Sequence, residues 1–328
     1  MGEQNKIRPL FIFSLPRSGS TLLQKILAHH PAISTSAETW LLLPILSWER
    51  KNAVFADYGH FVLRKAIAEF CDSFPAGRKD YDKELRKFVF SLYEKKSRGK
   101  GKYFLDKTPR YHLIADRIID LFPEGKFIFL WRNPLAVAAS IIETFGGGDW
   151  NIYKFNVDFY KGVTNLVKAW LANQQKALSV QFEKLLHDPE NTAAAIFSYL
   201  DLENDSTALS KFHGVNLEGS LGDPTGIKKY SSISTDPLDK WKNTMATPQR
   251  KRWCRKYIQW LGEKNIHAMG YDFEELNGMA QSLSTDKKRI AGDTFRMLYG
   301  FIYNLFEFHL VSRNIKNMRV SKIHHNHI

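Results

Sequence analysis

The order of apolar and polar residues along the chain predicts short buried strands that alternate with helices. Strand-like runs occupy residues 10–15, 102–107, 126–131 and 178–182, and a proline closely follows each of the first three. Strands that alternate with helices are typical of a parallel sheet covered on both faces, so the pattern predicts an α/β fold. Helical spacing of apolar positions predicts the intervening helices at residues 20–29, 39–70, 81–96, 110–121, 134–145 and 189–200.

The expected sheet also indicates where a ligand would bind. Ligands of parallel α/β sheets bind at the carboxyl ends of the strands. The loops after Leu15, Leu105 and Trp131 are therefore expected to lie along one rim. Residues 221–240 are rich in Gly, Pro, Ser and Thr, and irregular segments of that length inside a compact domain often have a function.

The loop after the first strand, residues 16–21, has the pattern of an anion-binding loop. A strand, a turn of small residues and a helix start place successive backbone N–H groups around one anion. The nucleoside-triphosphate signature G-x-x-x-x-G-K-[ST] is absent, and Arg17 precedes the single glycine, Gly19. An ordinary helix N-cap at Ser18 or Ser20 is the alternative interpretation.

A second candidate anion site follows the third strand. Arg132 stands at the strand end, Pro134 suits the first turn of a helix, and Ser140 lies about two turns further on. The arginine and the hydroxyl can together bind a phosphate, with the guanidinium bidentate. Alternatively, Arg132 caps the sheet or forms a salt bridge there.

Charge narrows the classes of partner. The 328 residues include 47 Lys and Arg against 34 Asp and Glu, a net charge of +13. Nucleic acid, an anionic membrane surface or a highly anionic small molecule would suit that excess. The basic residues are spread along the chain and no nucleic-acid motif is present, so we do not expect nucleic acid binding.

The sequence shows few features that would indicate secretion, disulfide bonding or a membrane span. Cys71 and Cys254 are too few and too far apart for a disulfide framework or a metal site. No segment reaches the ~18 uninterrupted apolar residues of a membrane span. The first strand begins within about ten residues of Met1, which leaves no room for a signal peptide. We therefore expect a cytoplasmic protein.

Several segments in fixed order resemble the sulfotransferase family that uses 3′-phosphoadenosine 5′-phosphosulfate (PAPS). They are "LPRSGSTLLQKILAHHP", "AETWLLLP", "DKTPRYHL", "FIFLWRNPLAVAAS", "VQFEKLLHDPENT", "DKW" at 239–241 and "MGYDF" at 269–273. The nearest branch contains the tyrosylprotein sulfotransferases and bacterial relatives. The resemblance implies a P-loop-NTPase-like parallel sheet. It places a sulfotransferase domain at 1–275 and leaves 276–328 as a helical C-terminal extension.

The resemblance also assigns the donor site. The donor carries a phosphosulfate and no γ-phosphate, so no metal is expected. Arg132 and Ser140 correspond to the 3′-phosphate site, Lys240 belongs to a segment over the nucleotide, and Phe182 stands where relatives carry Tyr. The 5′-phosphosulfate residues are Ser18, Gly19, Ser20, Thr21 and Leu22, and the covering segment includes Lys228, Lys229, Tyr230, Ser231 and Ser232.

Three residues match the family's catalytic positions. Glu38, in "SAETW", corresponds to the base that takes the acceptor's proton. Arg17 and Lys107 correspond to the pair of cations that offset charge developing during transfer.

Each of these positions also has a structural interpretation. Glu38 can be a helix N-terminal charge or cap partner, and Lys107 a solvated strand end. Asp106 is expected to orient Lys107 or Arg110. His112 is a rival base, although its position does not match the histidine used in some branches.

Aromatic residues outside these motifs suggest further surfaces. Trp40, Trp131 and Trp150 can line an acceptor cleft, although aromatics at these spacings are more often core. In the extension, 276–328, apolar residues repeat at helical spacing and a basic stretch follows. Such a helix can lie on an anionic membrane surface or pack on its own domain or on a second copy. The apolar positions are Phe295, Leu298, Phe301, Ile302, Leu305, Phe306 and Leu310.

The sequence therefore predicts a PAPS-dependent sulfotransferase that acts on a hydroxyl or amine of a glycan, lipid or small metabolite. A small-molecule or nucleotide kinase on a related fold is the alternative, and metal-independent activity would separate the two. A non-catalytic nucleotide-binding or membrane-associated module is a third hypothesis. Residues 291–328 are the expected site of peripheral membrane contact, and the oligomeric state is left open.

Overall fold

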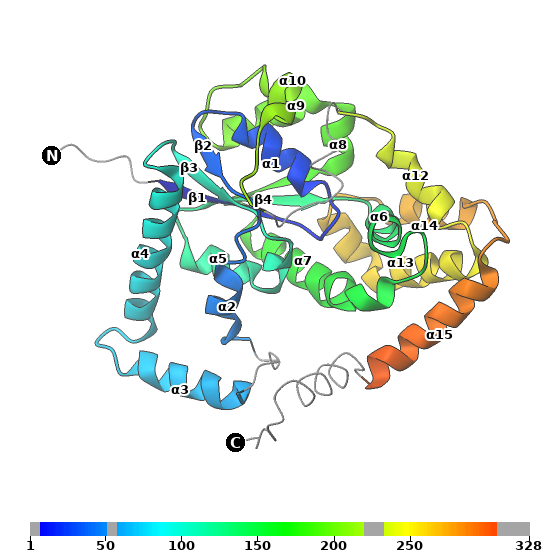
Figure 1. Cartoon of the computed structure of the whole chain (residues 1–328), viewed down its shortest axis with the longest axis horizontal. Coiled ribbons are helices and arrows are strands. Elements are labelled where there is room, and N and C mark those ends of the chain that lie inside the picture. The colour runs from blue at the N-terminus through cyan, green and yellow to red at the C-terminus, as the bar shows by residue number, and fades with distance from the viewer. Residues whose placement is uncertain (1–6, 51–57, 220–232, 307–328) are drawn as a thin grey trace.

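The computed structural model describes residues 7–50, 58–219 and 233–306, and its centre is one parallel sheet. The strand order is β2-β3-β1-β4-β5, and all four neighbouring pairs are parallel (Figure 1). The predicted α/β fold is therefore confirmed. The strands are β1 (Arg8–Phe13), β2 (Ile33–Thr35), β3 (Tyr103–Asp106), β4 (Lys126–Trp131) and β5 (Ala177–Gln181).

Helices cover both faces of the sheet, as the alternating pattern predicted. Along β1, Leu10 and Ile12 point into one hydrophobic cluster, and Phe11 and Phe13 point into the other. The first cluster packs against the helices drawn above the strands in Figure 1. They are α1 (Ser20–Ala28), α8 (Phe182–His187), α9 (Pro189–Tyr199) and α10 (Ala208–Lys211), followed by the turn η4 (Phe212–Gly214).

The opposite face carries the larger cluster. Its sheet side is a set of stacked rings, with Phe11 and Phe127 centred 5.9 Å apart and Phe13 and Phe127 6.0 Å apart. The elements that pack here are α2 (Leu42–Ser47), α4 (Arg78–Ser97), η1 (Pro109–Leu113), α5 (Ala115–Leu121), α6 (Pro134–Gly146), η2 (Ile152–Phe155), η3 (Val157–Gly162), α7 (Val163–Asn173), α13 (Pro248–Ala268) and α14 (Phe273–Ser282).

Three local differences from the sequence expectations have physical causes. Strand β2 was not predicted because "IST" has one apolar residue, and it lies at the edge of the sheet, paired only with β3. The helix expected at 110–121 is divided into η1 and α5 at Ile114, whose φ of −140° is not helical. The helical region expected at 39–70 contains α2 and most of α3 (His60–Asp72), and residues 51–57 lie outside the described part.

The C-terminal region continues from the sheet domain without a break in packing. Helix α12 (Pro237–Thr244) precedes α13, and α14 crosses residue 275, so the boundary expected there stays a prediction. Helix α15 (Ile290–Phe306) follows. Arg250 of α13 and Asp293 of α15 form a buried ion pair, 2.7 Å between Nη2 and Oδ1. Among the described helices, none is long and apolar enough to cross a membrane.

Candidate active site

The loop between β1 and α1 brings the chain against a buried aromatic ring. Gly19 has φ +87°, a conformation that favours glycine, and a Cβ placed there would lie 2.2 Å from the ring of Phe182. Gly19 is the N-cap of α1, and no described side chain caps this helix. The alternative that Ser18 or Ser20 is a side-chain N-cap is therefore wrong. Gly19, Ser20 and Thr21, at the start of this helix, line the cavity described below.

Arg17 is fixed by both residues expected at the second anion site. Its backbone is left-handed, with φ 67°. Arg132 Nη1 donates to the carbonyl oxygen of Arg17 at 2.7 Å, and Arg17 Nε donates to Ser140 Oγ at 3.3 Å. The Arg132 guanidinium also lies 4.8 Å from the ring centre of Phe182. Arg132, Ser140 and Phe182 therefore meet on one side of the loop.

Glu38 and Lys107 form an ion pair beside the same loop. Lys107 Nζ lies 3.0 Å from Glu38 Oε1, and their side chains are 3% and 12% exposed, Lys107 being the more buried. Trp40 Nε1 donates to the other carboxylate oxygen at 3.2 Å. Glu38 precedes α2 without capping it and Lys107 is buried, so a helix cap and a solvated strand end are both wrong for these residues.

A buried network stands directly behind this pair. Thr39 Oγ1 donates to Asp106, 2.9 Å from each oxygen, and Tyr93 and Tyr111 donate to Asp106 Oδ2 at 2.8 and 2.9 Å. Burial raises the pKa of Asp106, and these hydrogen bonds oppose the rise. The expected direct contact of Asp106 with Lys107 or Arg110 is wrong, since those cations pair with Glu38 and Asp158. Asp106 instead holds the segment after β2 against the end of β3 through Thr39.

His112 is poorly placed for a base. Its Nε2 lies 2.6 Å from Asp158 Oδ1, and its side chain has no exposure. Burial lowers the pKa of His112, although Asp158 partly offsets this effect. His112 does not line the cavity, whereas Glu38 does.

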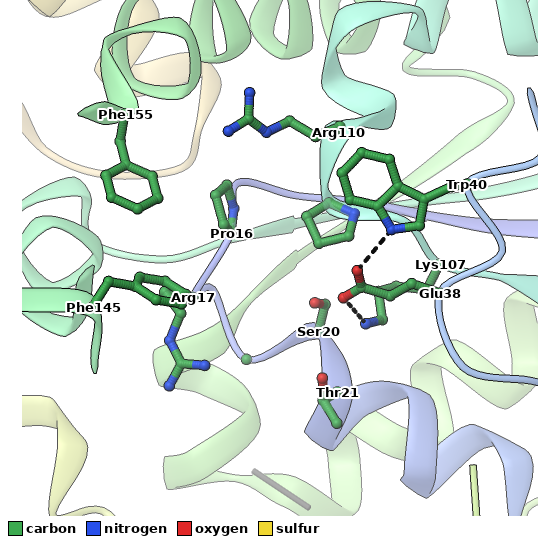
Figure 2. A pocket seen from close by; sticks show the side chains of 12 residues that line it. Pro16, Arg17, Ser20, Thr21, Glu38, Trp40, Lys107, Arg110, Phe145 and Phe155 are labelled. Atoms are coloured by element: carbon green, nitrogen blue, oxygen red, sulfur yellow. Dashed lines mark hydrogen bonds and ion pairs between the residues drawn. The ribbon is translucent and has the colours of Figure 1, made fainter. Parts of the chain in front are cut away.

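A cavity of about 220 Å³ joins the loop after β1 to the Glu38–Lys107 pair (Figure 2). Figure 2 shows Ser20 and Thr21 at one end and Arg110 and Phe155 at the other. The Arg17 guanidinium points away from the Glu38–Lys107 pair in this view. The lining residues are Pro16, Arg17, Gly19, Ser20, Thr21, Glu38, Trp40, Lys107, Pro109, Arg110, Phe145 and Phe155.

Some expected residues lie elsewhere. Trp40 lines the cavity, but Trp131 and Trp150 belong to the buried core, so these two do not form the expected cleft. Lys240 is exposed on α12, with Nζ 3.5 Å from Asp236, and does not line the cavity. Lys228, Lys229, Tyr230, Ser231 and Ser232 lie outside the described residues.

Glu183 links two distant segments, a contact that was not predicted from the sequence. Glu183 Oε1 accepts from the backbone N–H of Asn133 at 2.8 Å, and its Oε2 accepts from Tyr271 Oη at 2.6 Å. This carboxylate holds the loop that carries Arg132 against the segment just before α14. A glutamate directly after a buried strand was the available signal.

Comparison with known proteins finds relatives of one family. A model of the sulfotransferase family matches residues 9–206. Nodulation protein NoeE of Sinorhizobium fredii (strain NBRC 101917 / NGR234) is 37% identical over 141 residues, which are 42% of this chain and 31% of that protein. A putative protein-tyrosine sulfotransferase of Caenorhabditis briggsae is 24% identical over 238 residues, 71% of this chain and 80% of that protein. The chain thus spans about a third of the length of NoeE.

Two solved structures share the fold. One is the sulfotransferase domain from the curacin biosynthetic pathway, with TM-score 0.53 and 22% identity over 81% of this chain and 98% of that domain. The other is the sulfotransferase domain from the Synechococcus PCC 7002 olefin synthase, with TM-score 0.52 and 20% identity over 82% and 96%. These likenesses confirm the P-loop-NTPase-like sheet. The family model covers more than half of the chain, and the chain belongs to the sulfotransferase family.

Proposed function

We propose that this protein transfers the sulfuryl group of PAPS to a hydroxyl or amine acceptor. The observation that carries the proposal is the Glu38–Lys107 ion pair, 3.0 Å long, which shares one cavity with the loop of Ser20 and Thr21. A carboxylate and a cation beside an anion-binding loop are the groups that this transfer needs.

The residues present fit a phosphosulfate and a second phosphate. Gly19 leaves no room for a Cβ, and the start of α1 has no side-chain cap among the described residues, so its N–H groups can face an anion. We assign the loop from Ser18 to Leu22 to the 5′-phosphosulfate. We assign Arg132 and Ser140 to the 3′-phosphate, with the Phe182 ring against the Arg132 guanidinium. Lys240 and residues 228–232 are assigned to the segment that covers the nucleotide.

Each catalytic residue has one task in this proposal. Glu38 accepts the proton from the acceptor's O–H or N–H group as that atom bonds to sulfur. The bond between sulfur and the phosphate oxygen breaks, and adenosine 3′,5′-bisphosphate leaves. Lys107 and Arg17 offset the charge on the transferred group and the leaving oxygen. The Arg17 guanidinium must then turn from Ser140, where this structure holds it, toward the Glu38–Lys107 pair.

The far end of the cavity is the proposed acceptor site. Trp40, Phe145 and Phe155 offer aromatic faces there, and Arg110 adds a cation. These groups suit a glycan, a lipid or a small metabolite with a polar ring. We also propose a cytoplasmic location, with residues 291–328 as the contact to a membrane. The alternative function, a kinase, is disfavoured because this chain lacks the G-K-[ST] signature.

The test is thermal unfolding with adenosine 3′,5′-bisphosphate beside ADP and Mg-ATP at matched concentrations. A ligand present at about 100 times its dissociation constant adds about 2.7 kcal/mol to the free energy of unfolding. We expect a large increase in Tm with the 3′,5′-bisphosphate and a small one with ADP. An increase with Mg-ATP alone would favour the kinase instead.

A further inference from the structure

Helix α15 is attached to the domain by one face. Gly300 lies so close to η2 that a Cβ there would be 2.6 Å from the ring of Tyr153. Tyr299 and Tyr303 place their rings 5.8 and 5.4 Å from Tyr153. Together with the buried pair of Asp293 and Arg250, these contacts fix the orientation of the helix.

The opposite face of α15 is apolar and open to solvent. Its members recur at spacings of three and four residues, so they form one stripe, here called the outer face. An apolar stripe of this size on a protein surface indicates an interaction site. The outer face consists of Phe295, Leu298, Ile302 and Leu305, whose exposed fractions lie between 37% and 70%.

A groove of about 560 Å³ opens beside the outer face. Phe301 of α15 lines this groove and is itself 67% exposed, so groove and outer face are continuous. The groove has aromatic walls, with Trp253 among them, and two cations from α13, Arg252 and Lys256. Among the described residues, neither cation has a carboxylate within ion-pair distance, and both are exposed to solvent.

Positive charges outnumber negative charges around this surface. Asp293 is the only carboxylate between residues 290 and 306, and it is buried and paired with Arg250. Arg289 and Arg296 both pair with Asp149. The sequence beyond α15 adds four basic residues against Glu307, namely Arg313, Lys316, Arg319 and Lys322. The surface therefore combines exposed apolar side chains with an excess of cations.

We propose that the outer face of α15 and the adjoining groove dock on the surface of an anionic lipid bilayer. The apolar residues enter the interface, and Arg252 and Lys256 meet lipid phosphates, because apolar burial and attraction to anionic lipid act together for such helices. Charge complementarity favours this occupant over a second copy, whose own Arg252 and Lys256 would repel these cations.

The docking surface connects to the candidate active site through η2. Tyr153 contacts α15, and Phe155, two residues on, lines the catalytic cavity and stacks on Phe145 with ring centres 5.4 Å apart. Docking would thus place the acceptor end of the cavity near the membrane, which suits a lipid-linked acceptor. This last step rests on the proposed sulfuryl transfer, and the docking surface specifies the membrane contact proposed above.

The test is co-sedimentation of the full chain with vesicles of phosphatidylcholine alone or with about 30% phosphatidylglycerol, so that only the second carries a negative surface potential. We expect binding to the anionic vesicles that weakens with salt. Replacing Phe295, Leu298 and Leu305 by Ser should lower it more than about tenfold. The matched control replaces three exposed residues of α3, Phe61, Val62 and Phe70, by Ser and should bind as the wild type does.

A second pair of variants tests the cations. Arg252→Gln with Lys256→Gln should reduce the preference for anionic lipid, while Arg255→Gln with Lys264→Gln, on the same helix but outside the groove, should leave most of it. Two results would overturn the proposal: vesicle binding that the outer-face variant leaves unchanged, or a dimer in solution that this variant dissociates. Thermal shift by adenosine 3′,5′-bisphosphate, measured on every variant, separates a failure of docking from a failure of the proposed donor site.

Discussion

The hydroxyl of Thr39 donates to the carboxylate of Asp106, 2.9 Å from both oxygens, and these residues directly adjoin Glu38 and Lys107 in the chain. One hydrogen-bonded contact between the segments that follow β2 and end β3 therefore sets how far apart the proposed base and the proposed cation lie. Because Asp106 is fully buried, its partners cannot be exchanged for water.

Thr39→Val should lower turnover without weakening donor binding. The variant keeps the shape of the side chain but leaves Asp106 with one donor fewer, at a cost of about 1–3 kcal/mol in the free energy of unfolding. We expect kcat to fall and the thermal shift by adenosine 3′,5′-bisphosphate to persist. Thr39→Ser keeps the hydroxyl and should recover most of the activity. Equal activity of all three proteins would show that the contact does not position Glu38.

Glu38→Gln and Arg132→Ala should separate turnover from binding. Glutamine cannot accept the acceptor's proton, so Glu38→Gln should abolish transfer while titration calorimetry still detects the 3′,5′-bisphosphate. Arg132→Ala removes a guanidinium that holds the Arg17 carbonyl and belongs to the proposed 3′-phosphate site. It should weaken nucleotide binding about tenfold or more. The opposite pattern, with binding lost only in Glu38→Gln, contradicts these roles.

Gly19→Ala should damage the anion-binding loop through two causes. The φ of +87° strains any residue with a Cβ, and the new methyl group would meet the Phe182 ring at 2.2 Å. We expect a loss of nucleotide binding, partly restored when Phe182→Ala is added. Gly147→Ala is the matched control, since its φ is +57° but a Cβ there would have no atom within 4 Å. That control should cost only the backbone strain, about 1 kcal/mol.

Stability should depend on pH through His112. Burial lowers its pKa below 6.5 in the folded chain, with Asp158 opposing and Arg110 and Arg50 adding to the shift. The unfolded chain then binds the proton first, so this contribution to stability is present above pH 6.5 and is lost as the pH falls through that value. Urea unfolding at several pH values should show that the free energy of unfolding falls as the pH is lowered, and His112→Gln should make this dependence on pH weaker. His213→Gln, at an exposed histidine, should leave the slope unchanged.

The sequence predicted those features that depend on neighbours in the chain. Strand β4 has the predicted limits because six residues, "KFIFLW", stand between turn-forming segments. The network around Asp106 could not be predicted, since its donors, residues 39, 93 and 111, come from three separate segments of the chain. The orientation of Arg17 toward Ser140 likewise depends on packing of α6 beside the loop, which periodicity does not encode.

The contacts of Arg250 limit how far this chain can be truncated at its C-terminal end. Its guanidinium donates to Asp293 of α15 and also to the backbone oxygens of Thr244 and Gly148, so one side chain joins three separate segments. A chain that ends at residue 275 would lose Asp293 and keep a cation enclosed by protein, which costs several kcal/mol. The unit that unfolds cooperatively should therefore reach at least to Asp293, well past residue 206, where the family match ends.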